Sequence, residues 1–140
     1  GMVKNMGSYT EKCIENLSEY DKERFIMAEF FIKKYFTHAK TYEKEHTSYG
    51  LKHQCEHFFQ ACEHLGVKFE FENTCYVSND AFKAAMRSLC YTGKSEYKGS
   101  PNEVYKYKYI GPKFWNGFQY CVPMTEDDWR KILDVHYNCR

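Results

Sequence analysis

Hydrophobic residues recur at intervals of three and four along the first half of the chain, which is the period of one face of an α-helix. The longest such stretch predicts a helix over Asp21–His38, and its wide apolar stripe is typical of a central core helix. A second stripe predicts a helix over Ser48–Leu65. Thr47 or Ser48 can cap its start, and Gly66 favours its end.

In the second half of the chain the pattern alternates between helical and strand-like periods. Val67–Phe71 alternates apolar and polar residues, which predicts a short half-buried strand, and Asn79–Cys90 has a helical stripe. Gly93–Asn102 is rich in turn residues and is expected to be a loop. Val104–Ile110 places tyrosines on one face and lysines on the other, so it predicts a strand, with Phe118–Val122 as its hairpin partner.

The remaining segments complete a single domain of 140 residues. We expect a short helix over Tyr9–Ser18, a charged connector over Lys40–His46 and a last helix over Glu126–Tyr137. The domain then consists of an N-terminal helical brace, a central part with the motif helices and the hairpin, and a C-terminal helix, at residues 9–45, 46–123 and 125–137.

This order of elements predicts an α+β fold that is mainly helical, with a small antiparallel hairpin. Helices followed by a two-stranded hairpin are arranged as in a winged helix. In that fold the helix before the hairpin enters the major groove of DNA. That helix is here Asn79–Cys90, and the hairpin, or wing, is Val104–Val122.

Charge is unevenly distributed, although the whole chain carries only +1. Residues 11–77 hold nine Lys or Arg against twelve Asp or Glu, whereas residues 78–113 hold seven against three. A basic segment of this kind favours an anionic partner, and a plain solvated surface is the alternative. The 13 tyrosines and 11 phenylalanines supply enough apolar area for a compact core.

The seven cysteines predict free thiols rather than a disulfide framework. Gly1–Tyr9 lacks the apolar segment of a signal peptide, and no apolar run reaches the length of a membrane span. We therefore expect a cytoplasmic protein that has no membrane partner.

A zinc-like spacing occurs in Cys55-x-His57 and Cys62-x-His64, but helical geometry argues against a metal site. At about 100° per residue, Cys62 lies close to Cys55, whereas His57 and His64 lie on the opposite side of the helix. We expect the two thiols to pack in the core and the chain to hold no metal or cofactor.

The polar side of the same helix gathers Tyr49, Lys52, His53 and Glu56. Such a patch is suited to acid–base chemistry or to phosphate contacts. The simpler interpretation, which we favour, is a solvated helix face with a Lys52–Glu56 pair worth a few tenths of a kcal/mol. Because the chain has no phosphate-binding loop, nucleophile elbow or metalloprotease motif, an enzyme is not the default expectation.

Two short motifs resemble a pattern in small uncharacterised proteins of phages and mobile elements. There, S-Y-x-L-K-H precedes Y-V-S-N-x-x-F-x-x-A-M and a G-Y pair; the corresponding segments here begin at Ser48 and Tyr76. Asn102, ahead of an aromatic strand, is also similar. This chain departs from the pattern at Cys90, where the family has glycine, and in the longer spacing between the motifs. The resemblance implies a phage or mobile-element context and a winged-helix-like fold, but no particular activity.

The leading hypothesis is a non-enzymatic DNA-binding module. Its candidate nucleic-acid contacts are the basic and motif residues Lys83, Arg87, Lys106, Lys108, Tyr49, Lys52 and His53. The first alternative is a protein–protein adaptor or an inhibitor of a host protein, since tyrosine is a frequent interface anchor. The second is an enzyme built on the patch that contains Glu56.

Overall fold

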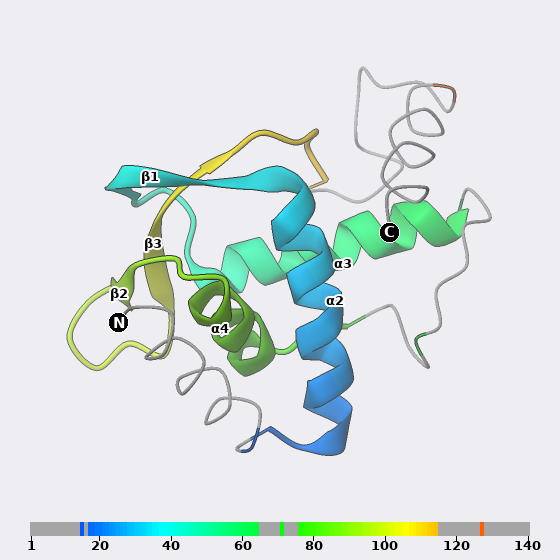
Figure 1. Ribbon diagram of the computed structural model, residues 1–140, viewed down its shortest axis with the longest axis horizontal. Coiled ribbons are helices and arrows are strands. Elements are labelled where there is room, and N and C mark those ends of the chain that lie inside the picture. Colours follow the sequence, from blue (N-terminus) through cyan, green and yellow to red (C-terminus); the bar gives the residue numbers. More distant parts are fainter. Residues whose placement is uncertain (1–14, 16, 65–70, 72–75, 115–126, 128–140) are drawn as a thin grey trace.

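The computed structural model describes residues 15, 17–64, 71, 76–114 and 127. The elements in these ranges are, in order, α2 (Glu19–Tyr35), β1 (Phe36–Glu43), α3 (Ser48–His64), α4 (Asn79–Ser88), β2 (Gly93–Ser95) and β3 (Glu103–Tyr109) (Figure 1). Helices together with a small antiparallel sheet make the fold α+β, as the sequence predicts. The starts of α3 at Ser48 and of α4 at Asn79 also agree with the prediction.

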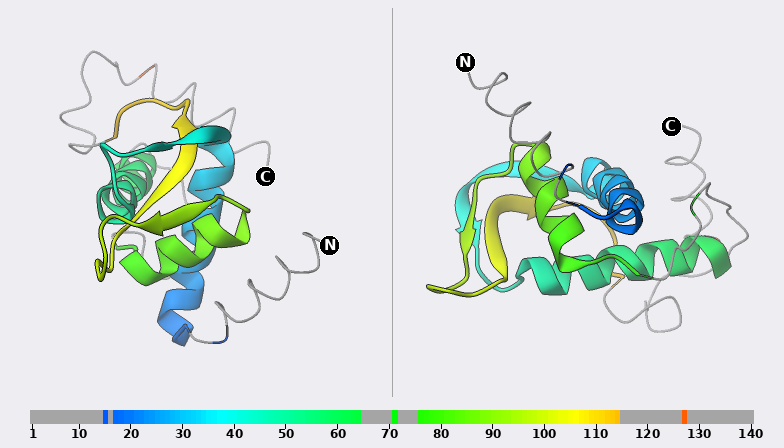
Figure 2. Two further views of the ribbon diagram at one scale, coloured as in Figure 1. Left: turned by 90° about the vertical axis from the view of Figure 1, so that its left-hand side faces the viewer. Right: turned by 90° about the horizontal axis from the view of Figure 1, so that it is seen from below.

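The three strands form one antiparallel sheet in the order β1-β3-β2. Phe36 of β1 pairs with Tyr109, and Gly93 of β2 pairs with Tyr105, so β3 is the central strand. The sheet forms one side of the molecule, and the helices lie on its inner side (Figures 1 and 2).

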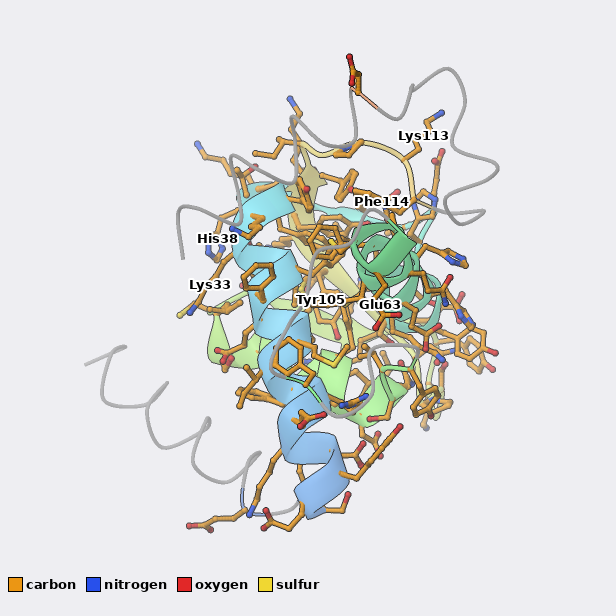
Figure 3. The ribbon with its side chains drawn as sticks, turned by 90° about the vertical axis from the view of Figure 1, so that its right-hand side faces the viewer. Lys33, His38, Glu63, Tyr105, Lys113 and Phe114 are labelled. Atoms are coloured by element: carbon orange, nitrogen blue, oxygen red, sulfur yellow. The ribbon has the colours of Figure 1, made fainter. Side chains whose placement is uncertain are left out.

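The core is a cluster of aromatic rings between the helices and the inner face of the sheet. Phe31 of α2 lies 5.6 Å from the ring of Phe58 of α3, and Phe114 lies 5.4 Å from the same ring (Figure 3). The side chains of Tyr105 and Tyr107, on the inner face of β3, are buried in this core. The predicted inward face of tyrosines on this strand is therefore confirmed.

The C-terminal end of α4 is closed by two backbone hydrogen bonds. The N–H of Cys90 donates to the carbonyl of Arg87, and the N–H of Tyr91 donates to that of Met86, both at 3.0 Å. This is a Schellman motif, in which the residue after the helix cap adopts a left-handed conformation. Cys90 occupies that position with φ of 74°.

The predicted helix Asp21–His38 is wrong at its C-terminal end, and Lys40–His46 is not a plain connector. The helix α2 ends at Tyr35, and Phe36 begins a strand that continues to Glu43. Phe36 stacks on Tyr107 of β3, with ring centroids 4.9 Å apart. The helical period continues through Phe36 in the sequence, but pairing with a strand some 70 residues away decides the conformation there.

The strand partner of β3 also differs from the predicted arrangement. The structure pairs β3 with β1 and β2, and β2 lies inside the segment Gly93–Asn102 that is expected to be a loop. The hairpin is therefore β2–β3, with residues 96–102 between the strands. The expected partner Phe118–Val122 lies outside the described residues. So does most of each of three further predicted elements: Tyr9–Ser18, Val67–Phe71 and Glu126–Tyr137.

Candidate functional site

The polar patch on α3 is organised around the carboxylate of Glu56. Its Oε2 lies 3.1 Å from Nζ of Lys52 and accepts a hydrogen bond from the backbone N–H of Val77 at 2.9 Å. Its Oε1 lies 2.9 Å from Nδ1 of His53. We call these four residues the Glu56 cluster. One carboxylate thus joins two side chains of α3 to the segment that leads into α4.

The expected solvated helix face is wrong for the charged pair. Lys52 and Glu56 are each only 6% exposed, because Tyr76 and Val77 lie against this side of α3. Val77 lies 21 positions after Glu56 in the chain, so the helical period of α3 alone does not predict the burial. Both sequence motifs meet here, and their contacts hold α3 and α4 together.

Exposed tyrosines form a row along the outside of the Glu56 cluster. Nζ of Lys52 lies 5.3 Å from the ring centre of Tyr49 and 4.7 Å from that of Tyr76. Tyr76 stacks on Tyr20 of α2 at 6.4 Å, and the guanidinium of Arg24 lies 4.7 Å from the ring of Tyr20. The three tyrosines of this row are 43–52% exposed. We call Tyr20, Tyr49 and Tyr76 the tyrosine row.

His53 is the most exposed of the three side chains that meet at the Glu56 carboxylate group. Its ring packs edge-on against Tyr49 at 4.6 Å, and its side chain is 41% exposed. The contact with Glu56 orients the imidazole, as carboxylates do for histidines in many sites. Tyr49, Lys52 and His53 therefore lie together, as the sequence predicts, but their arrangement is tied to helix packing.

The two predicted cations of α4 contact the β2–β3 hairpin, Lys83 at its loop and Arg87 at the first residue of β3. Nζ of Lys83 donates to the carbonyl oxygen of Pro101 at 2.7 Å. Arg87 binds the carboxylate of Glu103 through two nitrogens, at 2.9 and 3.3 Å. A bidentate pair of this kind is among the stronger polar contacts in proteins. Both side chains therefore hold the hairpin against α4.

A group of lysines lies on the outer face of the sheet, opposite the buried tyrosines. Lys106 and Lys108 point outward from β3, and Lys94 lies on the adjacent strand β2, where it pairs with Val104. Within the described residues, these lysines have no carboxylate oxygen within 4.0 Å. We call Lys94, Lys106 and Lys108 the lysine face.

An aromatic ring that sequence reasoning missed lies close to two of these lysines. The ring centre of Tyr42 lies 4.4 Å from Nζ of Lys94 and 5.2 Å from Nζ of Lys106. Lys94 was noticeable in the sequence as part of the basic segment. Tyr42 was not, because it lies in the segment expected to be a connector.

The seven predicted contact residues thus fall into three groups: on α3 around Glu56, on α4 against the β2–β3 hairpin, and on the outer face of β3. The prediction that Cys55 and Cys62 are packing residues is confirmed, since both thiols are fully buried in the core. Burial raises the pKa of each thiol above its usual value, with neighbouring acidic groups adding to the shift.

One further group brings possible metal ligands together. Ligand atoms of Glu43, Glu45 and His46 lie within 4.8 Å of one another at the end of β1. The carboxylate of Glu43 already accepts hydrogen bonds from the backbone N–H of His46 and from the hydroxyl of Tyr107, both at 3.0 Å. These contacts hold the carboxylate of Glu43 at the end of β1 against the backbone that follows the strand and against Tyr107 of β3.

Comparison of the chain with protein-family models, with curated proteins and with solved structures found no match. Among the described helices, none combines the length and the apolar character that crossing a membrane requires.

Proposed function

We propose that the chain is a small DNA-binding module with a winged-helix-like build. The observation that carries the proposal is the order of elements, helix–strand–helix–helix–strand–strand, with β3 between β1 and β2 in the sheet. In a winged helix, the helix directly before the hairpin faces DNA and the hairpin touches the flanking backbone. Here these elements are α4 and the β2–β3 hairpin.

The lysine face supplies the electrostatic part of the proposal. Duplex DNA presents a dense row of phosphates, and lysines that approach it release condensed counterions. Lys94 and Lys108 are exposed, and Lys106 is half-buried with its ammonium on the outer side. Contacts of this kind position a protein on the duplex and do not read its sequence.

In this proposal Lys83 and Arg87 of α4 position the hairpin, whereas the sequence predicts that they contact DNA. Lys83 and Arg87 bind Pro101 and Glu103, and so they set the position of the hairpin relative to α4. The contacts of Lys52 and His53 with Glu56 support the junction between α3 and α4 in the same way. Charge reversal at these residues would disturb folding as well as binding. The lysine face is the better surface for a test.

The test compares charge reversals on two sides of the molecule. Lys106→Glu combined with Lys108→Glu is expected to weaken binding of a fluorescently labelled duplex by roughly tenfold or more. The reason is that each substitution turns an attraction to a phosphate into a repulsion and removes the counterion release of that contact. Lys22→Glu combined with Lys33→Glu makes the same change of net charge on α2, where Figure 3 labels Lys33. The proposal is wrong if both double variants bind like the wild type.

The tyrosine row favours a second candidate function, an adaptor or inhibitor that binds a host protein. Three exposed tyrosines next to buried cations form a rigid aromatic surface, and tyrosine is enriched at interface hot spots. A partner captured by the wild type and lost with Tyr49→Ala, but not with Tyr97→Ala in the hairpin loop, would support this candidate. The expected phage or mobile-element context and cytoplasmic location are part of both proposals.

A further inference from the structure

A long irregularity interrupts the pairing of β1 with β3. His38 pairs with Tyr107 and Glu43 pairs with Tyr105, so residues 39–42 of β1 face a single residue of β3, Lys106. Bulges of this kind change the direction of side chains and are common beside functional sites. The bulge brings Tyr42, the last of these residues, over the outer face of the sheet.

The position of Tyr42 explains how two ammonium groups are held close to one ring. Nζ of Lys94 lies 4.4 Å and Nζ of Lys106 lies 5.2 Å from its centre, both within the range of cation–π attraction. Like charges gathered around one ring repel each other, and no carboxylate among the described residues lies within 4.0 Å to offset this. An anion that bridges the two ammonium groups would relieve the repulsion.

We infer that Tyr42, Lys94 and Lys106 form a binding site for a phosphate of the DNA backbone. The lysines contact the phosphate, and Tyr42 is the positioning residue that fixes their ammonium groups. This inference rests on the proposed function and deepens it, because it names the group that is bound and the residues that hold it. It places this phosphate contact on the β2–β3 hairpin, the element that touches the flanking backbone in the proposed function.

The test measures the affinity for a labelled duplex over a range of salt concentrations, using the full chain. Lys94→Gln with Lys106→Gln is expected to reduce the slope of log K against log salt by about 2, roughly one unit for each lysine that contacts a phosphate. Tyr42→Leu is expected to weaken binding about fivefold and to lower the slope, because the lysines lose their common support. Tyr42→Phe keeps the aromatic face and is expected to bind within about twofold of the wild type.

One control variant, together with the slope as the readout, separates this site from a general loss of structure. Tyr20→Leu removes an exposed tyrosine from the tyrosine row and is expected to leave affinity and slope unchanged. Partial unfolding would lower the active fraction without changing the slope, so the slope reports on the site itself.

The possible outcomes distinguish the inference from the proposed function. If the wild type binds no duplex DNA, both fail. If the wild type binds and Tyr42→Leu keeps its affinity and slope, the phosphate site is wrong while DNA binding stands. If Tyr42→Phe loses as much affinity for the duplex as Tyr42→Leu, the hydroxyl rather than the ring supports binding, and the positioning role of the ring is overturned.

Discussion

The carboxylate of Glu56 accepts a hydrogen bond from the backbone N–H of Val77 at 2.9 Å, and this contact connects α3 to the segment before α4 across 21 residues. The same carboxylate pairs with Lys52 at 3.1 Å, and both side chains are nearly buried. A buried ion pair is strongly destabilised when one partner is removed, because the other charge is left without compensation. The Glu56 cluster is therefore a structural element with measurable energetic consequences.

Glu56→Leu is expected to lower the free energy of unfolding by about 3 kcal/mol, because it leaves Lys52 buried without its partner. Glu63→Leu, an exposed position on the same helix, serves as the matched control and is expected to change little (Figure 3). Adding Lys52→Met to Glu56→Leu should recover much of the loss. Urea unfolding followed by circular dichroism measures all three, and equal stability of the two single variants would contradict the buried pair.

Cys90→Gly is expected to stabilise the chain by about 1 kcal/mol. Cys90 has φ of 74° at the end of α4, a conformation that costs a side-chain-bearing residue energy and costs glycine little. Cys90→Ala removes the thiol but keeps the backbone strain, so it is expected to bring no such gain. The difference between these two variants in chemical denaturation isolates the backbone effect, and a gain with alanine alone would contradict it.

Gln54→Leu is expected to raise the free energy of unfolding by about 1–2 kcal/mol, the cost of a buried polar group without a partner. Gln54 is fully buried, and within the described ranges neither of its amide atoms has a hydrogen-bond partner. Gln60→Leu on the same helix is the control, since Gln60 is partly exposed and its Oε1 contacts Nδ1 of His57 at 3.2 Å. A loss of stability with Gln54→Leu would show that the amide is bonded after all.

Stability is expected to fall as the pH rises above about 9. Burial raises the pKa of Tyr91 to about 12, and burial together with Glu43 raises that of Tyr107. Burial also raises the pKa of the Cys55 thiol. The unfolded chain then releases protons that the folded chain keeps, so these groups contribute their full stability at neutral pH and lose it in alkali.

Thermal unfolding between pH 7 and 11 measures this dependence. Tyr91→Phe removes one of the titrating groups, so its melting temperature should fall less steeply than that of the wild type above about pH 10, where an unperturbed phenol ionises. A melting temperature that stays level up to pH 11 would contradict the burial of these phenols and thiols.

Local patterns in the sequence predict the elements whose conformation is decided locally. Helices begin at Ser48 and Asn79, where the apolar stripes begin, and the hydroxyl of Ser78 caps α4 by accepting a hydrogen bond from the backbone N–H of Ala81. The tyrosines of β3 face inward because alternation sets the face of a strand. The boundary between α2 and β1 is different. The side chain of Phe36 continues a helical stripe, but the ring of Tyr107, far along the chain, determines where it packs.

The candidate site was only partly predictable for the same reason. The α3 wheel gathers Lys52 and Glu56 correctly, but it contains no information about Val77, which covers them. The basic character of Arg87 is visible in the sequence, whereas its partner Glu103 is brought close only by the fold of the hairpin. The position of Tyr42 depends on a bulge in β1 that no local sequence pattern predicts.

DNA binding by the lysine face is tested by titrating the wild-type chain into a labelled random duplex at increasing salt concentration and following the fluorescence anisotropy. Three phosphate contacts by the lysine face predict a slope of log K against log salt of about −3, with binding in the micromolar range at low salt (on the order of 10⁻⁶ M). A chain that binds no duplex at low salt, or whose affinity does not change with salt, would contradict the account.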